Sequence, residues 1–239
     1  MQTEPYIQPL HAPIANPILC IVGPTGAGKT HLAMSLAQYA QSIGKTIELI
    51  SMDSALVYRG LDIGSAKPSK AEQATVIHHL IDILEPTQVY SAARFANDAN
   101  RLCHEINQRG HIPVVVGGTM LYWRAWAFGL SALPAANPDI RLRLDEEGKT
   151  IGWPAMHAKL ALIDPVTAER LKPNDSQRVQ RALEVFEITG KPMSTLLANS
   201  PSDDGREGST IPSWINLVSL EPADRKRLHQ NLEKRFDEM

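Results

Sequence analysis

Residues 18–30 read ILCIVGPTGAGKT, and this stretch decides the fold of the first half of the chain. Its five opening residues are apolar, which predicts a buried strand over Ile18 to Val22. The next eight match the pattern G-x-x-x-x-G-K-[ST] in full. Beyond them, Leu32, Leu36 and Tyr39 recur at the spacing of a helix. A strand, a glycine-rich turn and a helix in this order predict a phosphate-binding loop.

The residue types in this loop are those that phosphate binding requires. Glycines allow successive backbone N–H groups to turn inward around phosphate oxygens, and the amino end of the following helix adds partial positive charge. Lys29 would supply a point charge, and the hydroxyl of Thr30 can coordinate a magnesium ion, Mg²⁺. The predicted phosphate-binding residues are Gly23, Pro24, Thr25, Gly26, Ala27, Gly28, Lys29 and Thr30.

Further strands and helices alternate along the first half of the chain. Strands are predicted over Thr46 to Ile50, Leu80 to Leu84 and Pro113 to Val116. A helix capped by Ser91 is expected to reach Arg109, with Gly110 just past its end. Because strands that alternate with helices pair in parallel through right-handed crossovers, we predict an α/β fold, a P-loop-type parallel sheet flanked by helices.

The second half of the chain has a different pattern. Short helical segments follow one another with prolines at their joints, and the clearest covers residues 176–189, capped by Asp175. A Ser-, Asp- and Gly-rich loop over residues 199–210 precedes another strand at 215–220. The predicted domains are residues 1–130, a P-loop α/β core, residues 131–205, a small all-helical insertion domain, and residues 206–239, a return to the core.

The composition excludes several classes of protein. Of the 239 residues 43% are hydrophobic and 21% charged, with 24 Lys and Arg against 26 Asp and Glu. This excludes a disordered chain, and it excludes a nucleic-acid binder that relies on overall positive charge, so RNA would be held by local clusters. Because there is no apolar run of roughly 18 residues, no signal peptide and no disulfide framework, we expect a soluble protein of the cytoplasm.

Asp53 is the acidic residue best placed to act beside the phosphate loop. A nucleotide hydrolase usually carries an acidic residue after a later strand, but the strand that ends at Val116 runs into Gly117 and Gly118 instead. Asp53 follows the second strand, and the carboxyl ends of parallel strands line the ligand crevice, where a carboxylate suits a general base. Capping of the following turn is the alternative role. The spacing alone fits a kinase of small molecules equally well.

Further sequence blocks identify the chain with one family. Besides the phosphate loop, these blocks are SMDSALVY (51–58), DIGSAKP (62–68), HHLID (78–82), YSA (90–92), VGGTMLY (116–122), NDSQRVQRALE (174–184) and GKP (190–192). In this order they cover nearly the whole chain, and they resemble the tRNA dimethylallyltransferases. Many families share the phosphate loop, whereas the full series is specific.

The resemblance implies transfer of a dimethylallyl group from dimethylallyl diphosphate to N6 of the adenine at position 37, beside the tRNA anticodon. It implies that the phosphate loop binds the donor's diphosphate, with Mg²⁺ at Thr30. The implied catalytic residues are Asp53 as general base, Thr30, and Arg235 for the leaving group, although Arg235 could equally be a solvated charge on a helix. The implied tRNA contacts are Asp53, Ser54, Ala55, Leu56, Thr119, Arg141, Gln177, Arg178, Val179, Gln180 and Arg181.

Several alternatives stay open. Arg178 and Arg181 share a helix face and could meet Asp175 and Glu184 rather than RNA. The chain could prenylate free adenine nucleotides, act as a P-loop kinase, or bind RNA without chemistry, and its loop could also accept ATP. Family members continue beyond the position of Met239 with helices that clasp the anticodon arm, so the resemblance implies a C-terminally short chain with an incomplete RNA clamp. A monomer is the simplest expectation.

Three other features receive structural interpretations. His78 and His79, near an aspartate, could suggest a metal cluster, but adjacent residues of a strand point to opposite faces, which favours structural roles. Trp123 and Trp126 lie at helical spacing and are expected in the core. Lys67 could contact a phosphate, or it could equally be an exposed loop lysine without a specific role.

Overall fold

The computed structural model describes residues 17–130, 133–198, 210–224, 226, 228–230 and 232–233. These residues divide into two compact units. The described residues from 17 to 129, together with the described residues from 210 onward, form one unit, which we call the sheet unit. The described residues from Leu130 to Ala198 form the other, which we call the helical unit. The predicted domain boundaries lie after residues 130 and 205, and the observed divisions lie after residues 129 and 209.

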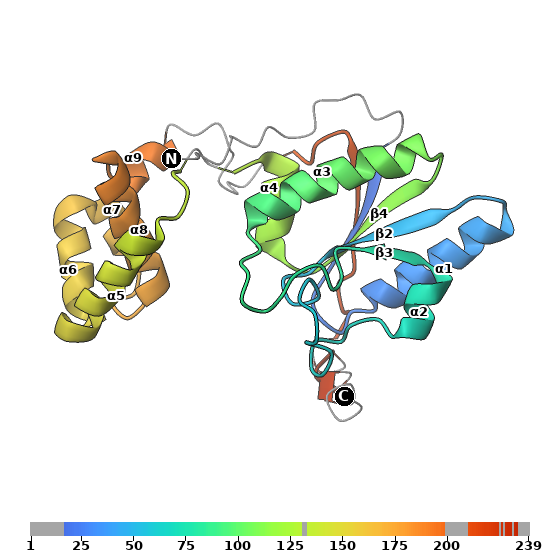
Figure 1. Cartoon of the computed structure of the whole chain (residues 1–239), viewed down its shortest axis with the longest axis horizontal. Coiled ribbons are helices and arrows are strands. Elements are labelled where there is room, and N and C mark those ends of the chain that lie inside the picture. The colour runs from blue at the N-terminus through green and yellow to red at the C-terminus, as the bar shows by residue number, and fades with distance from the viewer. Residues whose placement is uncertain are drawn as a thin grey trace. The chain divides into compact units, whose positions relative to one another are not determined.

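The sheet unit is built on a five-stranded sheet. Its strands are β1 (Ile18–Val22), β2 (Ile47–Met52), β3 (Ile77–His79), β4 (Ile112–Gly117) and β5 (Ile215–Ser219). They lie in the order β3-β2-β4-β1-β5, and every neighbouring pair is parallel (Figure 1). The neighbours β1 and β4 connect onward in opposite directions, toward β2 and toward β5. Such a switch point opens a crevice at the carboxyl ends of the strands.

The third strand lies where the sequence did not predict it. β3 covers residues 77–79, and the predicted strand from Leu80 to Leu84 is wrong. Leu80 and Asp82 have φ angles of 62° and 55°, in the left-handed region that a strand cannot use. The segment turns instead, and Leu84 forms an isolated parallel bridge with Tyr58. Apolar composition alone does not distinguish such a buried turn from a strand.

Helices cover both faces of the sheet, with α1 and α3 on opposite faces (Figure 1). The helices of the sheet unit that precede β5 are α1 (Lys29–Ser42), α2 (Lys70–Thr75), α3 (Ala92–Gln108) and α4 (Met120–Phe128). The side chain of Ser91 accepts a hydrogen bond from the Arg94 N–H at 3.1 Å, and Gly110 follows the helix with a φ of 74°. Both predicted ends of α3 are therefore confirmed to within one residue. Trp123 and Trp126 are buried, as expected.

The described residues of the helical unit contain helices and no strand. The helices are α5 (Pro138–Ile151), α6 (Trp153–Ile163), α7 (Pro165–Arg170), α8 (Ser176–Thr189) and α9 (Met193–Ala198). Three of the prolines that mark the joints stand in the first turns of α5, α6 and α7, where a missing N–H costs no hydrogen bond. Leu144, Met156, Leu160 and Val179 form the core of this unit. Across the described residues of both units, no helix is long and apolar enough to span a membrane.

A buried carboxylate ties the amino ends of β2 and β4 to the end of α3. Glu48 is fully buried, and its oxygens accept hydrogen bonds from Arg109 at 2.8 and 3.2 Å. A ring nitrogen of His79 and one of His111 each lie 2.6 Å from the same carboxylate. Burial by itself would raise the pKa of Glu48, but the hydrogen bonds from these three side chains lower it to about 2.

Replacing Glu48 by Gln should destabilise the protein by roughly 2 kcal/mol at neutral pH, because Arg109 loses its charged partner. Since the pKa of Glu48 is lowered in the fold from 4.5, its stabilising effect is complete above pH 4.5 and is lost as the pH falls toward 2. Urea unfolding should show the difference between wild type and E48Q shrinking over that range. E105Q changes a carboxylate whose ion pair with Arg101 is more exposed, and it should alter stability by at most about 0.5 kcal/mol. A difference for E48Q that stayed constant with pH would contradict the role of the charge.

Candidate active site

The phosphate-loop segment joins β1 to α1 and has the backbone shape of an anion cradle. Gly23, Gly26 and Gly28 have φ angles of 151°, 81° and 87°, and Gly28 immediately precedes α1. A Cβ on Gly23 would lie 2.5 Å from the carbonyl oxygen of Leu220, so this position has no room for a side chain. The turn brings the amino end of a 14-residue helix to the carboxyl end of the sheet, where its partial positive charge faces the crevice.

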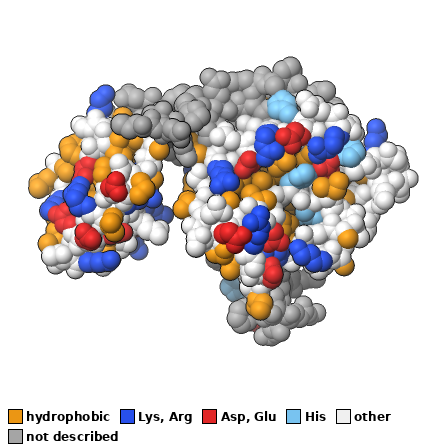
Figure 2. Space-filling model, viewed as in Figure 1, with side chains coloured by type: hydrophobic (Ala, Val, Ile, Leu, Met, Phe, Trp, Pro, Cys, Tyr) orange, Lys and Arg blue, Asp and Glu red, His pale blue; other side chains and the backbone are white. Residues whose placement is uncertain are grey.

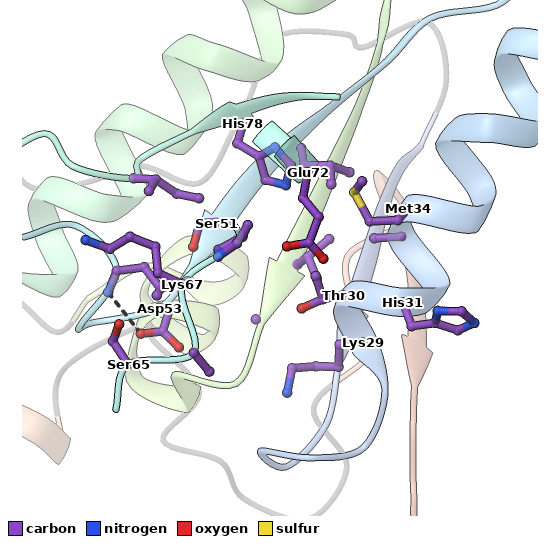
Figure 3. Close-up of a pocket in the computed structure, with 18 of the residues that line it drawn as sticks. Lys29, Thr30, His31, Met34, Ser51, Asp53, Ser65, Lys67, Glu72 and His78 are labelled. Atoms are coloured by element: carbon purple, nitrogen blue, oxygen red, sulfur yellow. Dashed lines mark hydrogen bonds between the residues drawn. The ribbon is translucent and has the colours of Figure 1, made fainter. Parts of the chain in front are cut away.

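Lys29 and Thr30 extend this cradle from the first turn of α1. The Lys29 ammonium donates a hydrogen bond to the Pro24 carbonyl at 2.8 Å, so it lies across the loop. Figure 3 shows Lys29 and Thr30 on the α1 side of a cavity, with Asp53 across from them. This cavity has a volume of about 1780 Å³ and is lined by loop residues, by α1 and by the ends of β2 and β4. It is large enough for a small diphosphate ester and part of a second substrate.

Asp53 lies just past the carboxyl end of β2 and lines the same cavity. Its Oδ1 accepts hydrogen bonds from the backbone N–H groups of Ala55 at 2.8 Å and Leu56 at 3.3 Å. The turn-capping role is therefore present, and it orients the carboxylate. The other oxygen, Oδ2, accepts no hydrogen bond from any of the described residues. One carboxylate oxygen fixes the side chain, and the second is left for a reacting group.

The segment after Asp53 contacts the segment after β4. The Ser54 N–H donates to Thr119 Oγ1 at 3.2 Å, and the Thr119 N–H donates to the Met52 carbonyl at 3.3 Å. Gly117 makes this approach possible, because a Cβ there would lie 2.0 Å from the Met52 oxygen. The structure thus brings together the candidate tRNA contacts of the sheet unit, which are Asp53, Ser54, Ala55, Leu56 and Thr119.

Two candidate tRNA contacts of the helical unit meet on one buried carboxylate. Glu184, which is fully buried, accepts hydrogen bonds from Arg141 at 3.0 and 3.1 Å and from Arg181 at 2.6 Å. The Asn137 N–H donates to it at 2.7 Å. Burial would raise the pKa of Glu184, but these hydrogen bonds hold it below its ordinary value. The pairing of Arg181 with Glu184 is the alternative that helical spacing predicts, and Arg141 joins it from another helix.

The remaining candidates on α8 differ in exposure. Gln177 and Arg178 are exposed, although Arg178 also pairs with Asp175 at 2.7 Å. Gln180 is half-buried and donates to the Arg141 carbonyl at 3.0 Å. Val179 is fully buried in the core of the helical unit, so its side chain packs there and does not present a surface to RNA. Its inclusion among the candidate contacts is corrected accordingly. Arg235 lies outside the residues that the structure describes.

Two further residues belong to the cavity wall, and the sequence left a phosphate contact open for Lys67 but predicted none for His78. Lys67 and His78 both line the cavity. Nδ1 of His78 lies 2.7 Å from the Val76 carbonyl, while Nε2 is buried without a hydrogen-bond partner, and burial lowers the pKa of this imidazole. His79 contacts Glu48 instead, so the two histidines do point apart. The described residues contain no group of three or more His, Cys, Asp or Glu side chains that could hold a metal ion.

Comparisons with known proteins agree on one family. The family model described as IPP transferase matches residues 56–239. The tRNA dimethylallyltransferase of Polynucleobacter asymbioticus is 84% identical over the whole chain, which spans 72% of that relative. The tRNA dimethylallyltransferase of Leptothrix cholodnii is 51% identical over 95% of the chain and 68% of its own length.

Solved structures give the same result. The full-length tRNA isopentenylpyrophosphate transferase from Bacillus halodurans is 36% identical, with a TM-score of 0.53, over 93% of this chain and 65% of that one. A eukaryotic dimethylallyltransferase acting on tRNA is 27% identical, with a TM-score of 0.71, over 93% of this chain and 52% of that one. With a parallel sheet, a phosphate loop and these relatives, the chain belongs to the IPP transferase family.

Proposed function

We propose that this chain transfers a dimethylallyl group from dimethylallyl diphosphate to N6 of adenine 37 in tRNA. The observation that carries this proposal is that the phosphate loop and the Asp53 carboxylate line one cavity. An anion-binding cradle and a base across from it fit a reaction in which a diphosphate leaves while an amine is deprotonated. The names of the relatives, tRNA dimethylallyltransferases, support the same donor group and acceptor.

Asp53 is proposed as the general base. N6 of adenine is a weak nucleophile because its lone pair is delocalised into the ring. As the bond from N6 to C1 of the dimethylallyl group forms and the bond from C1 to the diphosphate oxygen breaks, N6 must lose a proton. Oδ2 of Asp53 is proposed to accept it, while Oδ1 stays bound to Ala55 and Leu56 and keeps the carboxylate in place.

The phosphate loop is proposed to stabilise the departing diphosphate. Negative charge develops on this group as the carbon–oxygen bond breaks. Lys29, which donates to the Pro24 carbonyl, and the amino end of α1 are in place before the reaction, so they need little reorganisation to receive this charge. Arg235 is proposed for the same task on the resemblance alone.

Thr30 is proposed to hold Mg²⁺ together with the donor's phosphate oxygens. Its hydroxyl lies in the first turn of α1, lines the cavity and has no hydrogen-bond partner among the described residues. A hydroxyl oxygen and phosphate oxygens are ligands that suit this ion, so the residues present fit it. When bound, Mg²⁺ would neutralise part of the charge of the diphosphate.

The tRNA is proposed to be held by local groups. Figure 2 shows Lys and Arg interspersed with Asp and Glu on the visible face of each unit, without a broad region of one sign. On the sheet unit the proposed contacts with the target adenine are Asp53 to Leu56 and Thr119. The adenine must leave its stack to reach them, and unstacking costs the least free energy in a loop. On the helical unit the exposed candidates are Gln177 and Arg178, whereas Arg141, Gln180 and Arg181 are half-buried.

The helical unit favours tRNA over a free adenine nucleotide as the acceptor, because its guanidinium groups suit phosphates and splayed bases. A P-loop kinase is the second candidate, since the loop itself would hold ATP equally well. The cytoplasmic location and the monomeric state rest on the sequence and stay predictions.

Incubation with labelled dimethylallyl diphosphate, Mg²⁺ and unmodified tRNA tests the proposal. We expect label in adenine 37 and none in AMP, with no consumption of ATP. The relative from Polynucleobacter asymbioticus serves as the positive control for the tRNA and the donor. Label in AMP alone, or no label from this chain while the control is active, would overturn the proposal.

A further inference from the structure

Lys67 is a nearly buried lysine whose ammonium group is fully used within the chain. Its side chain is only 4% exposed. The ammonium donates to the Tyr58 carbonyl at 2.9 Å, to Asp62 at 2.7 Å and to Asp82 at 2.5 Å. These three bonds use all three N–H donors of a lysine, so none is left for a phosphate. The alternative of an exposed loop lysine is therefore wrong, because the surrounding loops enclose it.

One of the two carboxylates that Lys67 holds, that of Asp82, belongs to a residue with a left-handed backbone. Asp82 has a φ of 55°, which for a residue other than glycine persists only where its surroundings hold it. Burial would lower the pKa of Lys67, but the two carboxylates raise it above its ordinary value, and Lys67 in turn lowers the pKa of Asp82. The pair is thus ionised, and it holds the turn after β3.

The backbone of this turn holds the segment that follows Asp53. The Asp82 N–H donates to the Leu56 carbonyl at 3.0 Å, and the next N–H, that of Ile83, donates to the Val57 carbonyl at 2.8 Å. Leu56 is the residue whose own N–H donates to Asp53 Oδ1 at 3.3 Å. A continuous series of contacts therefore runs from the Lys67 ammonium through Asp82 and Leu56 to the Asp53 carboxylate. Figure 3 shows the Lys67 and Asp53 side chains in the same part of the cavity.

We propose that Lys67 is a positioning residue for prenyl transfer, which fixes the Asp53 carboxylate through Asp82 and Leu56 without touching either substrate. This inference rests on the proposed role of Asp53 as the base. A base displaced by about 1 Å loses most of its effect, so the contribution of Lys67 lies in the rate of the chemical step. If Lys67 instead contacted a phosphate directly, it would contribute to the binding of the donor.

The test compares K67M with K70M. The Lys70 ammonium also lies 3.4 Å from an oxygen of Asp82, but the Lys70 side chain is 85% exposed. K70M therefore removes one positive charge from beside Asp82, as K67M does, without opening a buried site. We expect K67M to lower kcat about 10²-fold, with the KM for dimethylallyl diphosphate changed less than twofold. K70M should change neither value more than twofold, and K67R should recover part of kcat. A raised KM with kcat unchanged would mean a phosphate contact, and both values unchanged would mean no role; either result overturns the proposal.

Two further variants separate this inference from the proposed function. If Lys67 acts through Asp53, K67M should lower single-turnover rates less than twofold in the D53N background, because the group it positions is already gone. A full 10²-fold loss there overturns the positioning role. If D53N itself is fully active, the proposed function of Asp53 fails first. If K67M does not fold, D82N tests the positioning role instead. Asn tolerates the left-handed backbone, so this substitution removes only the charge of the side chain. We expect about a tenfold loss of kcat in D82N, and an unchanged kcat overturns the proposal.

Discussion

Replacing Asp53 by Asn should lower the rate of prenyl transfer by about 10³-fold, within the range that positioned general bases contribute. The amide oxygen of Asn can still accept the hydrogen bonds from Ala55 and Leu56, so the turn stays as it is. The substitution replaces Oδ2 by an amide nitrogen, which cannot accept the proton from N6. Single-turnover transfer of labelled dimethylallyl to tRNA measures the effect, and filter binding measures the affinity for tRNA, which should change less than threefold.

The matched control for D53N is E85Q. Glu85 is an exposed carboxylate of the same unit, paired with Arg59, and it lies outside the residues that line the cavity. E85Q should retain the wild-type rate. Full activity in D53N would mean that another group removes the N6 proton, and a loss of tRNA binding that matched the loss of rate would mean that Asp53 acts in binding alone.

Replacing Lys29 by Met should lower kcat/KM for dimethylallyl diphosphate by roughly 10²- to 10³-fold, the loss seen when one fixed group that stabilises developing charge is removed. Met keeps the length of the side chain and removes the charge. The loop's N–H groups and Thr30 remain, so residual turnover is expected. Initial rates over a range of donor concentrations measure the effect.

K45M is the control for Lys29, because Lys45 is an exposed lysine of the same unit, outside the cavity lining. It should leave the kinetics unchanged. Donor kinetics for K29M within threefold of wild type would show that the diphosphate is bound elsewhere. That result would contradict the assignment of the phosphate loop as the donor site.

Features that depend on short stretches of chain could be read from the sequence. The phosphate loop, the cap at Ser91 and the cap at Asp175 each need only residues within a few positions of one another. The side chain and the backbone that it serves are then neighbours whatever the rest of the fold does. The parallel α/β class follows for the same reason, from the order of strands and helices, and the position of Asp53 follows from its place at the end of a strand.

The tertiary structure decided which charges are buried and what they hold. Lys67 and Asp82 are 15 residues apart, Arg141 and Glu184 are 43 apart, and Glu48 and His111 are 63 apart. No local pattern links such pairs, because each contact exists only once separate elements have packed and removed water from between them. The same holds for the turn at Leu80, where an apolar segment becomes a loop because Val57 and Leu56 accept its hydrogen bonds. Local sequence therefore determines the groups that can do the chemistry, and long-range packing determines how firmly they are held.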